Sequence, residues 1–260
     1  MPEGDTIHRA AARLAPLLEG EELEGFEARL LMGTRPRVGE RIGSVHANGK
    51  HLLIDFSGGL TLDTHMGMAG TWSVIEPGGR PRRAPHLLRV RLVVPRGEAH
   101  CYAAPTIRTY PTATPVTPID HLGPDLAAPE PDVAAAARRW AELAGPDDTV
   151  ADVLLDQRIA SGVGNVYVSE TCWRVAIHPE APASSVEPLR RERVLAAAAT
   201  LLRANVAVAG GGRRTVPGGL AVYGRRGNGC RRCGTRITSG RVGRRQRVAY
   251  WCPSCQVSAQ

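Results

Sequence analysis

The N-terminus, Met1-Pro2-Glu3, places a secondary amine beside a carboxylate once Met1 is removed. An α-amine has a pKa of roughly 7.7–8.0, so part of it is unprotonated and nucleophilic near neutral pH. The Glu3 carboxylate can act as a general acid or base for the same reaction. This pair could therefore carry out covalent catalysis through Pro2, although Pro2 taken alone is better explained structurally. The structural alternatives are a small residue that permits Met1 removal and, for Glu3, a surface charge or helix cap.

Lys50 is the second candidate for chemistry, because it is the only lysine among the thirty-three Lys and Arg residues. Arginine does not release its proton in proteins, whereas lysine can. A chain that otherwise uses arginine for positive charge is expected to keep a lysine where a proton is exchanged. The alternative is a solvated charge in the Gly49-Lys50 turn.

Four of the six cysteines form two CxxC pairs separated by eighteen residues, a spacing typical of a four-cysteine zinc site. We predict that this set binds one structural Zn²⁺, with two disulfides or redox pairs as the alternative. The other two cysteines are expected to be buried thiols. The predicted ligands are Cys230, Cys233, Cys252 and Cys255, and the remaining thiols are Cys101 and Cys172.

The net charge of +8 is unevenly distributed. Residues 193–260 contain thirteen arginines and neither Asp nor Glu, whereas the rest holds twenty basic and twenty-five acidic residues. Such a basic segment is typical of proteins that bind the phosphate backbone of nucleic acids. A solubilising surface is the alternative. No apolar run is long enough for a membrane span, so we expect a soluble, cytoplasmic protein. We also expect it to act as a monomer.

These residues need a scaffold, and the first half of the chain predicts a helix followed by β-structure. Apolar residues recur at helical spacing over 6–18, with Asp5 or Thr6 as the cap. Alternating apolar residues over 41–103 predict a β-sandwich or barrel. The Pro- and Thr-rich passage 105–118 is expected to break this pattern and end the domain.

The second half predicts helices and then the cysteine unit. Helices are expected at 132–143, 149–156 (capped by Thr149), 164–173 and from Pro188 to Gly210–Gly212. The Gly- and Arg-rich residues 213–228 are expected to be mobile, and 247–251 to form the returning strand of the zinc unit. The predicted fold class is α+β, with domains at 1–118, 119–224 and 225–260.

Four motifs, in this order along the chain, together resemble the formamidopyrimidine-DNA glycosylase/endonuclease VIII family, in its endonuclease VIII-like branch. They are Pro2-Glu3-Gly4, Gly49-Lys50, the stretch 154–170 (LLDQRIASGVGNVYVSE) and the cysteine unit that ends RVAYWCPSCQ. The resemblance implies a bifunctional DNA glycosylase/AP lyase of base-excision repair. It also implies an N-terminal helix plus β-sandwich, a helix–two-turn–helix domain and a zinc-finger β-hairpin, with damaged double-stranded DNA held between the two halves.

The resemblance implies a role for each candidate catalytic residue. The Pro2 amine attacks the sugar C1′ to form an iminium, and Glu3 protonates the sugar ring oxygen as the base departs. Lys50 contacts phosphate and donates the proton for β-elimination. Arg247 reaches phosphate through its planar fork and supports δ-elimination.

Other matching residues are expected to bind DNA or to hold the helices together. Asn165 grips phosphate at the N-terminus of its helix, with a structural cap as the alternative. The residues expected to hold the helices together are Gln157, Tyr167 and Glu170.

A glycosylase flips the damaged nucleotide out of the duplex, and an apolar side chain then fills the vacancy. The stretch 65–70 (HMGMAG) resembles the family's intercalation loop, with Met68 as the wedge and a core methionine as the alternative. Arg108 is expected to contact DNA as a void-filling residue. Its surroundings, 104–110 (APTIRTY), depart from the family's Asp-Pro-Arg-Arg-Phe-like stretch.

The motifs point to two kinds of lesion. Pro2-Glu3-Gly4 resembles the branch that prefers oxidised pyrimidines, whereas 65–68 (HMGM) and 222–225 (VYGR) resemble the purine-specific branch. We expect oxidised pyrimidines and abasic sites as substrates. A non-catalytic damaged-DNA-binding protein and an RNA-binding protein are the alternatives.

Overall fold

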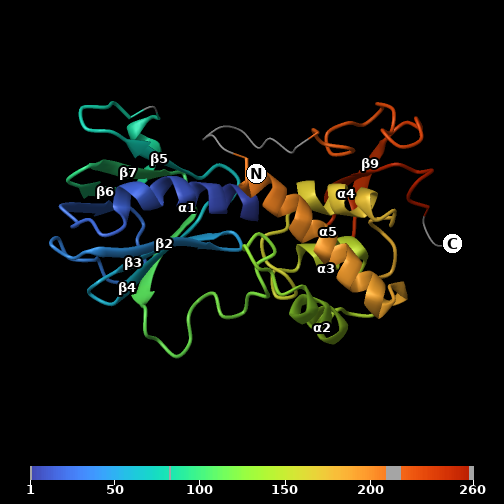
Figure 1. Cartoon of the computed structure of the whole chain (residues 1–260), viewed down its shortest axis with the longest axis horizontal. Helices are drawn as coiled ribbons and strands as arrows, with labels where there is room; N and C mark the ends of the chain where they lie inside the picture. The colour runs from blue at the N-terminus through green and yellow to red at the C-terminus, as the bar shows by residue number, and fades with distance from the viewer. Residues whose placement is uncertain (1, 82, 209–217, 258–260) are drawn as a thin grey trace. The chain divides into compact units, whose positions relative to one another are not determined.

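The computed structural model of the 260-residue chain describes residues 2–81, 83–208 and 218–257 (Figure 1). Its contacts divide the chain into two compact units, residues 1–120 and residues 121–260. The first unit combines a helix with two sheets, and the second combines helices with a two-stranded hairpin, which confirms the α+β class. Within the described ranges, no helix is both long and apolar enough to cross a bilayer.

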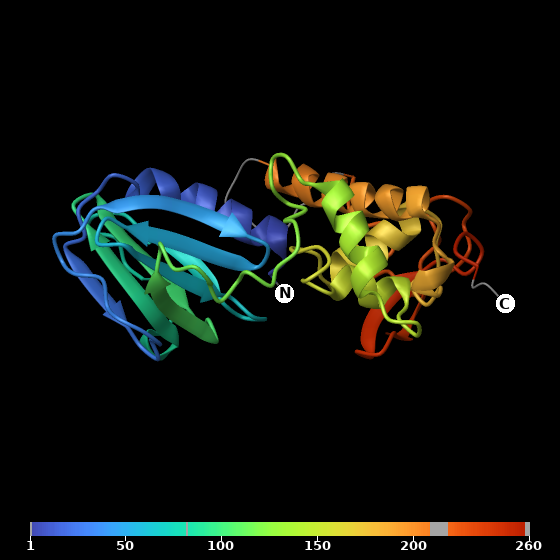
Figure 2. The same ribbon diagram turned by 90° about the horizontal axis from the view of Figure 1, so that it is seen from below.

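Two four-stranded antiparallel sheets form the sandwich of the first unit (Figure 2). One sheet has the order β1-β6-β7-β5 and the other has the order β2-β3-β4-β8. Successive side chains of a strand point to opposite faces, so the alternating apolar residues meet in the core between the sheets. The strands are β1 (Gly25–Ala28), β2 (Ile42–Asn48), β3 (His51–Phe56), β4 (Leu60–His65), β5 (Thr71–Ile75), β6 (Leu88–Val94), β7 (Gly97–Tyr102) and β8 (Thr106–Pro111), and the short 3₁₀ helix η1 (Pro85–Leu87) precedes β6.

Helix α1 (Gly4–Leu18) packs against strands of both sheets through one apolar face. The periodicity over 6–18 predicted this helix correctly but not its cap. Glu3 is the N-cap residue, and its side chain makes no capping hydrogen bond. Asp5 and Thr6 instead lie within the first turn. The helix therefore begins two residues after Pro2.

The passage 105–118 does not simply break the β-pattern, because strand β8 lies within it. β8 pairs with β4 over its full length, and Ile107 and Thr109 face the core. Thr, Ile and Tyr favour strands, and Pro is tolerated at a strand end. The strand brings Arg108 directly opposite Asp63 of β4.

The second unit contains the four helices that the sequence predicted for this half of the chain, each starting within one residue of its expected position. Helix α5 ends at Val206, earlier than expected; Gly210–Gly212, predicted to end it, and residues 213–217 lie outside the described residues. The elements are α2 (Val133–Leu143), α3 (Val150–Leu155), α4 (Asn165–Arg174), η2 (Ala183–Ser185), α5 (Pro188–Val206), β9 (Thr238–Val242) and β10 (Arg247–Trp251).

The helices and the hairpin of the second unit share one apolar core. Helix α5 packs against α2 and α4 (Figure 1). Strand β10 packs against α4. Val242 of β9 and Ala249 of β10 are buried in the same cluster as Leu154 and Tyr167 of the helices. The hairpin is therefore part of the helical core rather than an appendage to it.

Candidate functional site

Pro2 and Glu3 lie directly before α1, where the start of the helix holds them. Pro2 is half-buried and Glu3 is fully buried. The Glu3 carbonyl oxygen accepts hydrogen bonds from the backbone N–H groups of Thr6 and Ile7, at 2.9 and 3.2 Å. N–H groups at the start of a helix favour a nearby negative charge. The first turn therefore fixes a carboxylate-bearing residue next to the proposed nucleophile.

Gly49 and Lys50 are the two central residues of the hairpin between β2 and β3, because Asn48 pairs with His51. Gly49 has a φ of +58°. A positive φ at the first central residue is the pattern of a type II′ turn, which favours glycine there. The turn places the half-buried Lys50 at the end of the second sheet.

A cluster of ionisable side chains next to Lys50 was missed by the sequence analysis. The Asp63 carboxylate accepts hydrogen bonds from His51 Nδ1 at 2.8 Å and from Arg108 Nε at 2.7 Å. Arg108 Nη2 also lies 2.7 Å from Asp63, which is fully buried, whereas the Arg108 side chain is 23% exposed. Burying a charge is costly unless it is paired, so Asp63 needs these partners. The only signal in the sequence was an acid within a strand of buried residues.

His65 ends β4 opposite His51, with the two ring centroids 5.0 Å apart. Burial, followed by the positive charges of His51 and Lys50, lowers the pKa of His65 to about 4. The ring is therefore neutral at neutral pH, and its Nδ1 accepts a hydrogen bond from the Gly67 backbone N–H at 3.3 Å. This bond shapes the loop that follows β4.

The loop at 65–70 buries one methionine and exposes the other. Met66 belongs to the sandwich core, whereas Met68 is 76% exposed. Gly67 has a φ of +53°, and a Cβ there would lie 2.8 Å from Pro105 Cγ, so the loop requires glycine. Met68 is thus an exposed apolar side chain on a tight, well-defined loop.

Asn165 is the first residue of α4, and Gly164 is the N-cap. Gly162 has a φ of +97°, which the tight turn before the helix requires. The Asn165 Oδ1 atom is buried and has no hydrogen-bond partner among the described residues. A buried polar atom without a partner is uncommon in proteins. This oxygen accepts hydrogen bonds, so a phosphate would have to be bound by the Nδ2 group of the same side chain.

Glu170, in the middle of α4, holds a backbone segment rather than another helix. Its carboxylate accepts hydrogen bonds from the backbone N–H groups of Ala221, Val222 and Tyr223, at 2.8, 2.9 and 2.9 Å. Residues 221–223 lie in the stretch that was expected to be mobile. Three hydrogen bonds to one buried carboxylate fix this part of it.

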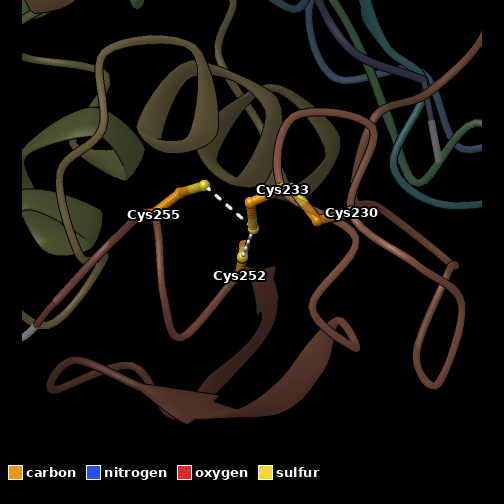
Figure 3. Close-up of side chains that lie close together, drawn as sticks. All are labelled: Cys230, Cys233, Cys252 and Cys255. Carbon is orange, nitrogen blue, oxygen red and sulfur yellow. Dashed lines mark hydrogen bonds between the residues drawn. The ribbon is translucent and has the colours of Figure 1, made fainter.

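The four predicted metal ligands come together at the ends of the β9–β10 hairpin (Figure 3). Their sulfur atoms all lie within 4.8 Å of one another, so this set could hold one metal ion. The Cys230 thiol is buried, but hydrogen bonds from Trp173 and from the backbone of Arg232 and Cys233 outweigh burial and lower its pKa to about 6. The Arg232 guanidinium lies 4.5 Å from the Trp173 ring centroid. A lowered pKa favours the thiolate, which is the form that binds metals.

Arg247 is the first residue of β10 and is exposed. It pairs with Val242 of β9, and Cys252 is the fifth residue after it along the chain. Asn165 and Arg247 thus belong to one unit, and Pro2, Glu3 and Lys50 to the other.

The first unit is a β-sandwich with an N-terminal helix, and the second is a helical unit with a four-cysteine hairpin. This combination is the architecture of a class of DNA glycosylases. Two family models match the chain: the N-terminal domain of formamidopyrimidine-DNA glycosylase over residues 1–106 and its H2TH domain over residues 122–216. The chain belongs to the formamidopyrimidine-DNA glycosylase/endonuclease VIII family of base-excision repair glycosylase/lyases, on its endonuclease VIII-like side.

Relatives of both branches match almost the whole chain. It is 38% identical to the probable endonuclease 8 2 of Streptomyces coelicolor, over 98% of this chain and 94% of that protein. It is 36% identical to the DNA-(apurinic or apyrimidinic site) lyase Nei2 of Mycolicibacterium smegmatis, over the full length of both. It is 33% identical to a formamidopyrimidine-DNA glycosylase of Methylococcus capsulatus, over 98% of this chain and all of that protein.

Solved structures confirm the fold. A structure of MutM in complex with DNA containing carbocyclic 8-oxo-G matches with a TM-score of 0.84 at 21% identity, over 99% of this chain and 100% of that chain. A Lactococcus lactis formamidopyrimidine-DNA glycosylase bound non-covalently to DNA containing an AP site matches with a TM-score of 0.82 at 21% identity. The match covers 98% of this chain and 100% of that chain.

Proposed function

We propose that this protein is a bifunctional DNA glycosylase/AP lyase that releases oxidised bases, mainly pyrimidines, from double-stranded DNA and then cleaves the strand by β,δ-elimination. The observation that carries the proposal is the Pro2–Glu3 pair, held at the start of α1 with Glu3 fully buried. The printed names of the relatives, endonuclease 8 2 and AP lyase Nei2, support the same activity.

Each candidate catalytic residue has one step in this reaction. The unprotonated Pro2 nitrogen attacks C1′, the bond from C1′ to the damaged base breaks, and Glu3 protonates the sugar ring oxygen. The resulting iminium acidifies the C2′ proton, and loss of this proton to water expels the 3′ phosphate. Lys50 donates a proton to the departing phosphate in this β-elimination. A second elimination, supported by Arg247, releases the 5′ phosphate.

DNA contacts are assigned to both units. Asn165 and Arg247 bind phosphate near the lesion, Met68 enters the vacancy left by the flipped nucleotide, and Arg108 contacts DNA nearby. The basic residues of 193–260 supply the general attraction to the phosphate backbone. The protein works as a cytoplasmic monomer, with functional domains at 1–118, 119–224 and 225–260.

One Zn²⁺ is proposed for the four-cysteine set. A tetrahedral zinc ion with Zn–S bonds of about 2.3 Å sets sulfur–sulfur distances of roughly 3.8 Å. The sulfur of Cys233 lies 3.5 Å from that of Cys252 and 3.4 Å from that of Cys255, close to this value. The ion would hold the two CxxC turns together and would take no part in the reaction.

Borohydride trapping on a duplex with one abasic site tests the proposed function. The Met1-processed protein is expected to form a covalent adduct, which Pro2→Gly weakens and retention of Met1 abolishes. An adduct that is independent of the N-terminus would move the nucleophile elsewhere. Tight DNA binding without any adduct would identify a damaged-DNA-binding protein instead.

Lesion preference is tested by excision of thymine glycol and 8-oxoguanine from matched duplexes. Faster release of thymine glycol is expected. Faster release of 8-oxoguanine would assign the protein to the purine-type activity that the 65–68 and 222–225 stretches resemble.

A further inference from the structure

The tip of the β9–β10 hairpin rests on the N-terminus of α3 through Asp152. The Arg244 backbone N–H donates to both oxygens of the Asp152 carboxylate, at 2.9 and 3.1 Å. Gly243 has a φ of +64°, and a Cβ there would lie only 2.5 Å from Asp152 Oδ1. Glycine therefore permits this close approach of the hairpin backbone to the carboxylate.

The same carboxylate closes the capping box of α3. The Thr149 backbone N–H and hydroxyl donate to Asp152 Oδ2, at 3.1 and 2.7 Å. Asp152 is buried, and although burial raises the pKa of its carboxyl, these hydrogen bonds outweigh burial and lower it. Asp152 is thus an ionised acceptor shared by a helix cap and a hairpin whose residues are far apart in sequence.

Asp152 binds the hairpin at Arg244, which is nearer to Arg247 along the chain than Cys252 is. Arg247 pairs with Val242, the residue next to Gly243. Cys252 is five residues further along the chain, which corresponds to roughly 16 Å of extended strand. A small displacement of the hairpin tip would therefore move Arg247 more directly than a change at the metal ligands.

Further contacts of the hairpin also avoid the metal ligands. The Tyr250 backbone N–H donates to Ser169 Oγ of α4 at 3.1 Å. Val242 and Ala249 pack in the core of the helical unit. These contacts attach the hairpin to α3 and α4 without using a cysteine.

We propose that Asp152 is a positioning residue that holds the Arg247 hairpin on α3 independently of the metal. Because α3 also packs against α4, the same contact sets the spacing between Arg247 and Asn165. This inference rests on the proposed role of Arg247 in δ-elimination. The metal then orders the two CxxC turns, while the helices set the place of the catalytic arginine.

Asp152→Asn, compared with Thr149→Ala in the full-length protein, tests the proposal. Asn keeps one acceptor oxygen and carries no charge, so the hydrogen bond from the Arg244 amide is either lost to the NH₂ group or loses its charge assistance. Thr149→Ala weakens the helix cap but leaves the carboxylate bonded to Arg244. Residue-level hydrogen exchange reports the hairpin amides, metal content is measured in parallel, and strand cleavage reports the ratio of δ- to β-elimination products.

We expect Asp152→Asn to speed exchange of the Arg244 amide at least tenfold, with the metal retained, as for the loss of a charge-assisted hydrogen bond. The ratio of δ- to β-elimination products should fall about tenfold, while borohydride trapping at Pro2 is unchanged. Thr149→Ala should change neither the exchange of the Arg244 amide nor the ratio of elimination products. Chelation of the wild-type protein should speed exchange at Cys230–Cys233 but leave the Arg244 amide protected.

Three results would overturn the proposal. The first is an Asp152→Asn variant whose Arg244 amide exchange and product ratio equal those of the wild type. The second is equal effects of Thr149→Ala and Asp152→Asn on these two measurements. The third is loss of Arg244 amide protection when the wild-type protein is chelated. Failure of the proposed function is recognised separately, as a wild-type protein that forms no trapped adduct. The exchange measurements would still decide whether Asp152 anchors the hairpin.

Discussion

Neighbouring charges set the state of the candidate site residues. Asp63 is buried and holds the guanidinium of Arg108 and the ring of His51, so both side chains are fixed beside the Lys50 turn. Burial of His65, together with the positive charges of Lys50 and Arg108, lowers its pKa and keeps it neutral. In unit 2, Asp152 fixes the hairpin before Arg247. At each point a buried carboxylate orders the basic or N–H groups around it.

Glu3→Gln separates base release from strand cleavage. If Glu3 supplies the proton for base departure, its loss should slow excision of an oxidised base by 10² to 10⁴-fold, on the order expected for a general acid. Abasic DNA needs no base departure, so its adduct with Pro2 should still form. The measurement is a time course of excision beside borohydride trapping. Equal losses of both would show that Glu3 only positions Pro2.

His65 should make stability depend on pH in a defined window. Its pKa is about 4 in the folded protein and near 6.5 when unfolded. Between these values the unfolded chain binds a proton that the folded protein does not, so stability falls as the pH drops from about 6.5 to about 4. Urea unfolding at several pH values should show a weaker fall for His65→Asn than for the wild type. His46→Asn, at an exposed position of β2, is the control, and an identical fall in all three would contradict the prediction.

At the scale of elements, α4 carries more of the candidate site than any other helix of its unit. It begins at Asn165, Ser169 accepts a hydrogen bond from β10, and Glu170 binds the backbone of 221–223. Trp173, near its end, donates to the Cys230 sulfur at 3.4 Å. One short helix thus holds a proposed phosphate ligand, the hairpin and a CxxC turn.

Glu170→Gln should destabilise the second unit by about 3 kcal/mol. The amide would turn an NH₂ group towards at least one of three N–H donors, so one or more charge-assisted hydrogen bonds are lost at a buried position. Urea unfolding followed by a probe in unit 2 measures the loss. Glu180→Gln changes an exposed carboxylate and is the matched control. A loss no larger than that of the control would mean that the 221–223 segment does not depend on Glu170.

For the whole molecule, charge is distributed to favour DNA. The C-terminal quarter is strongly basic, whereas the rest of the chain is slightly acidic in total. Nine arginines lie between residues 225 and 247, around the proposed zinc site and hairpin. Binding of the DNA backbone should therefore depend mainly on this region and on ionic strength.

DNA affinity should fall steeply with salt. A protein that makes six to ten phosphate contacts loses about 10³ to 10⁵ in affinity between 50 and 200 mM salt, because bound counterions are released on association. Fluorescence anisotropy on an undamaged duplex gives the slope. Arg236→Gln, next to the CxxC turn, should reduce the slope by about one contact if it touches phosphate. A flat dependence for the wild type would refute binding through the basic segment.

The sequence by itself determined the helices of the second unit, the returning strand, the four-cysteine set and the family. These features depend on local periods and spacings: 3.6 residues per turn for helices, 2 for strands and CxxC for metal ligands. The N-cap of α1 and strand β8 were missed, because both depend on how the first unit packs.

Only the tertiary structure decided which partners the buried carboxylates meet. Asp63 and Arg108 are 45 residues apart, and Asp152 and Arg244 are 92 apart. No local pattern predicts such pairs, because their contact depends on how strands align in a sheet and how the hairpin packs on α3. The same packing partly buries His65 and lowers its pKa, which residue type alone does not reveal.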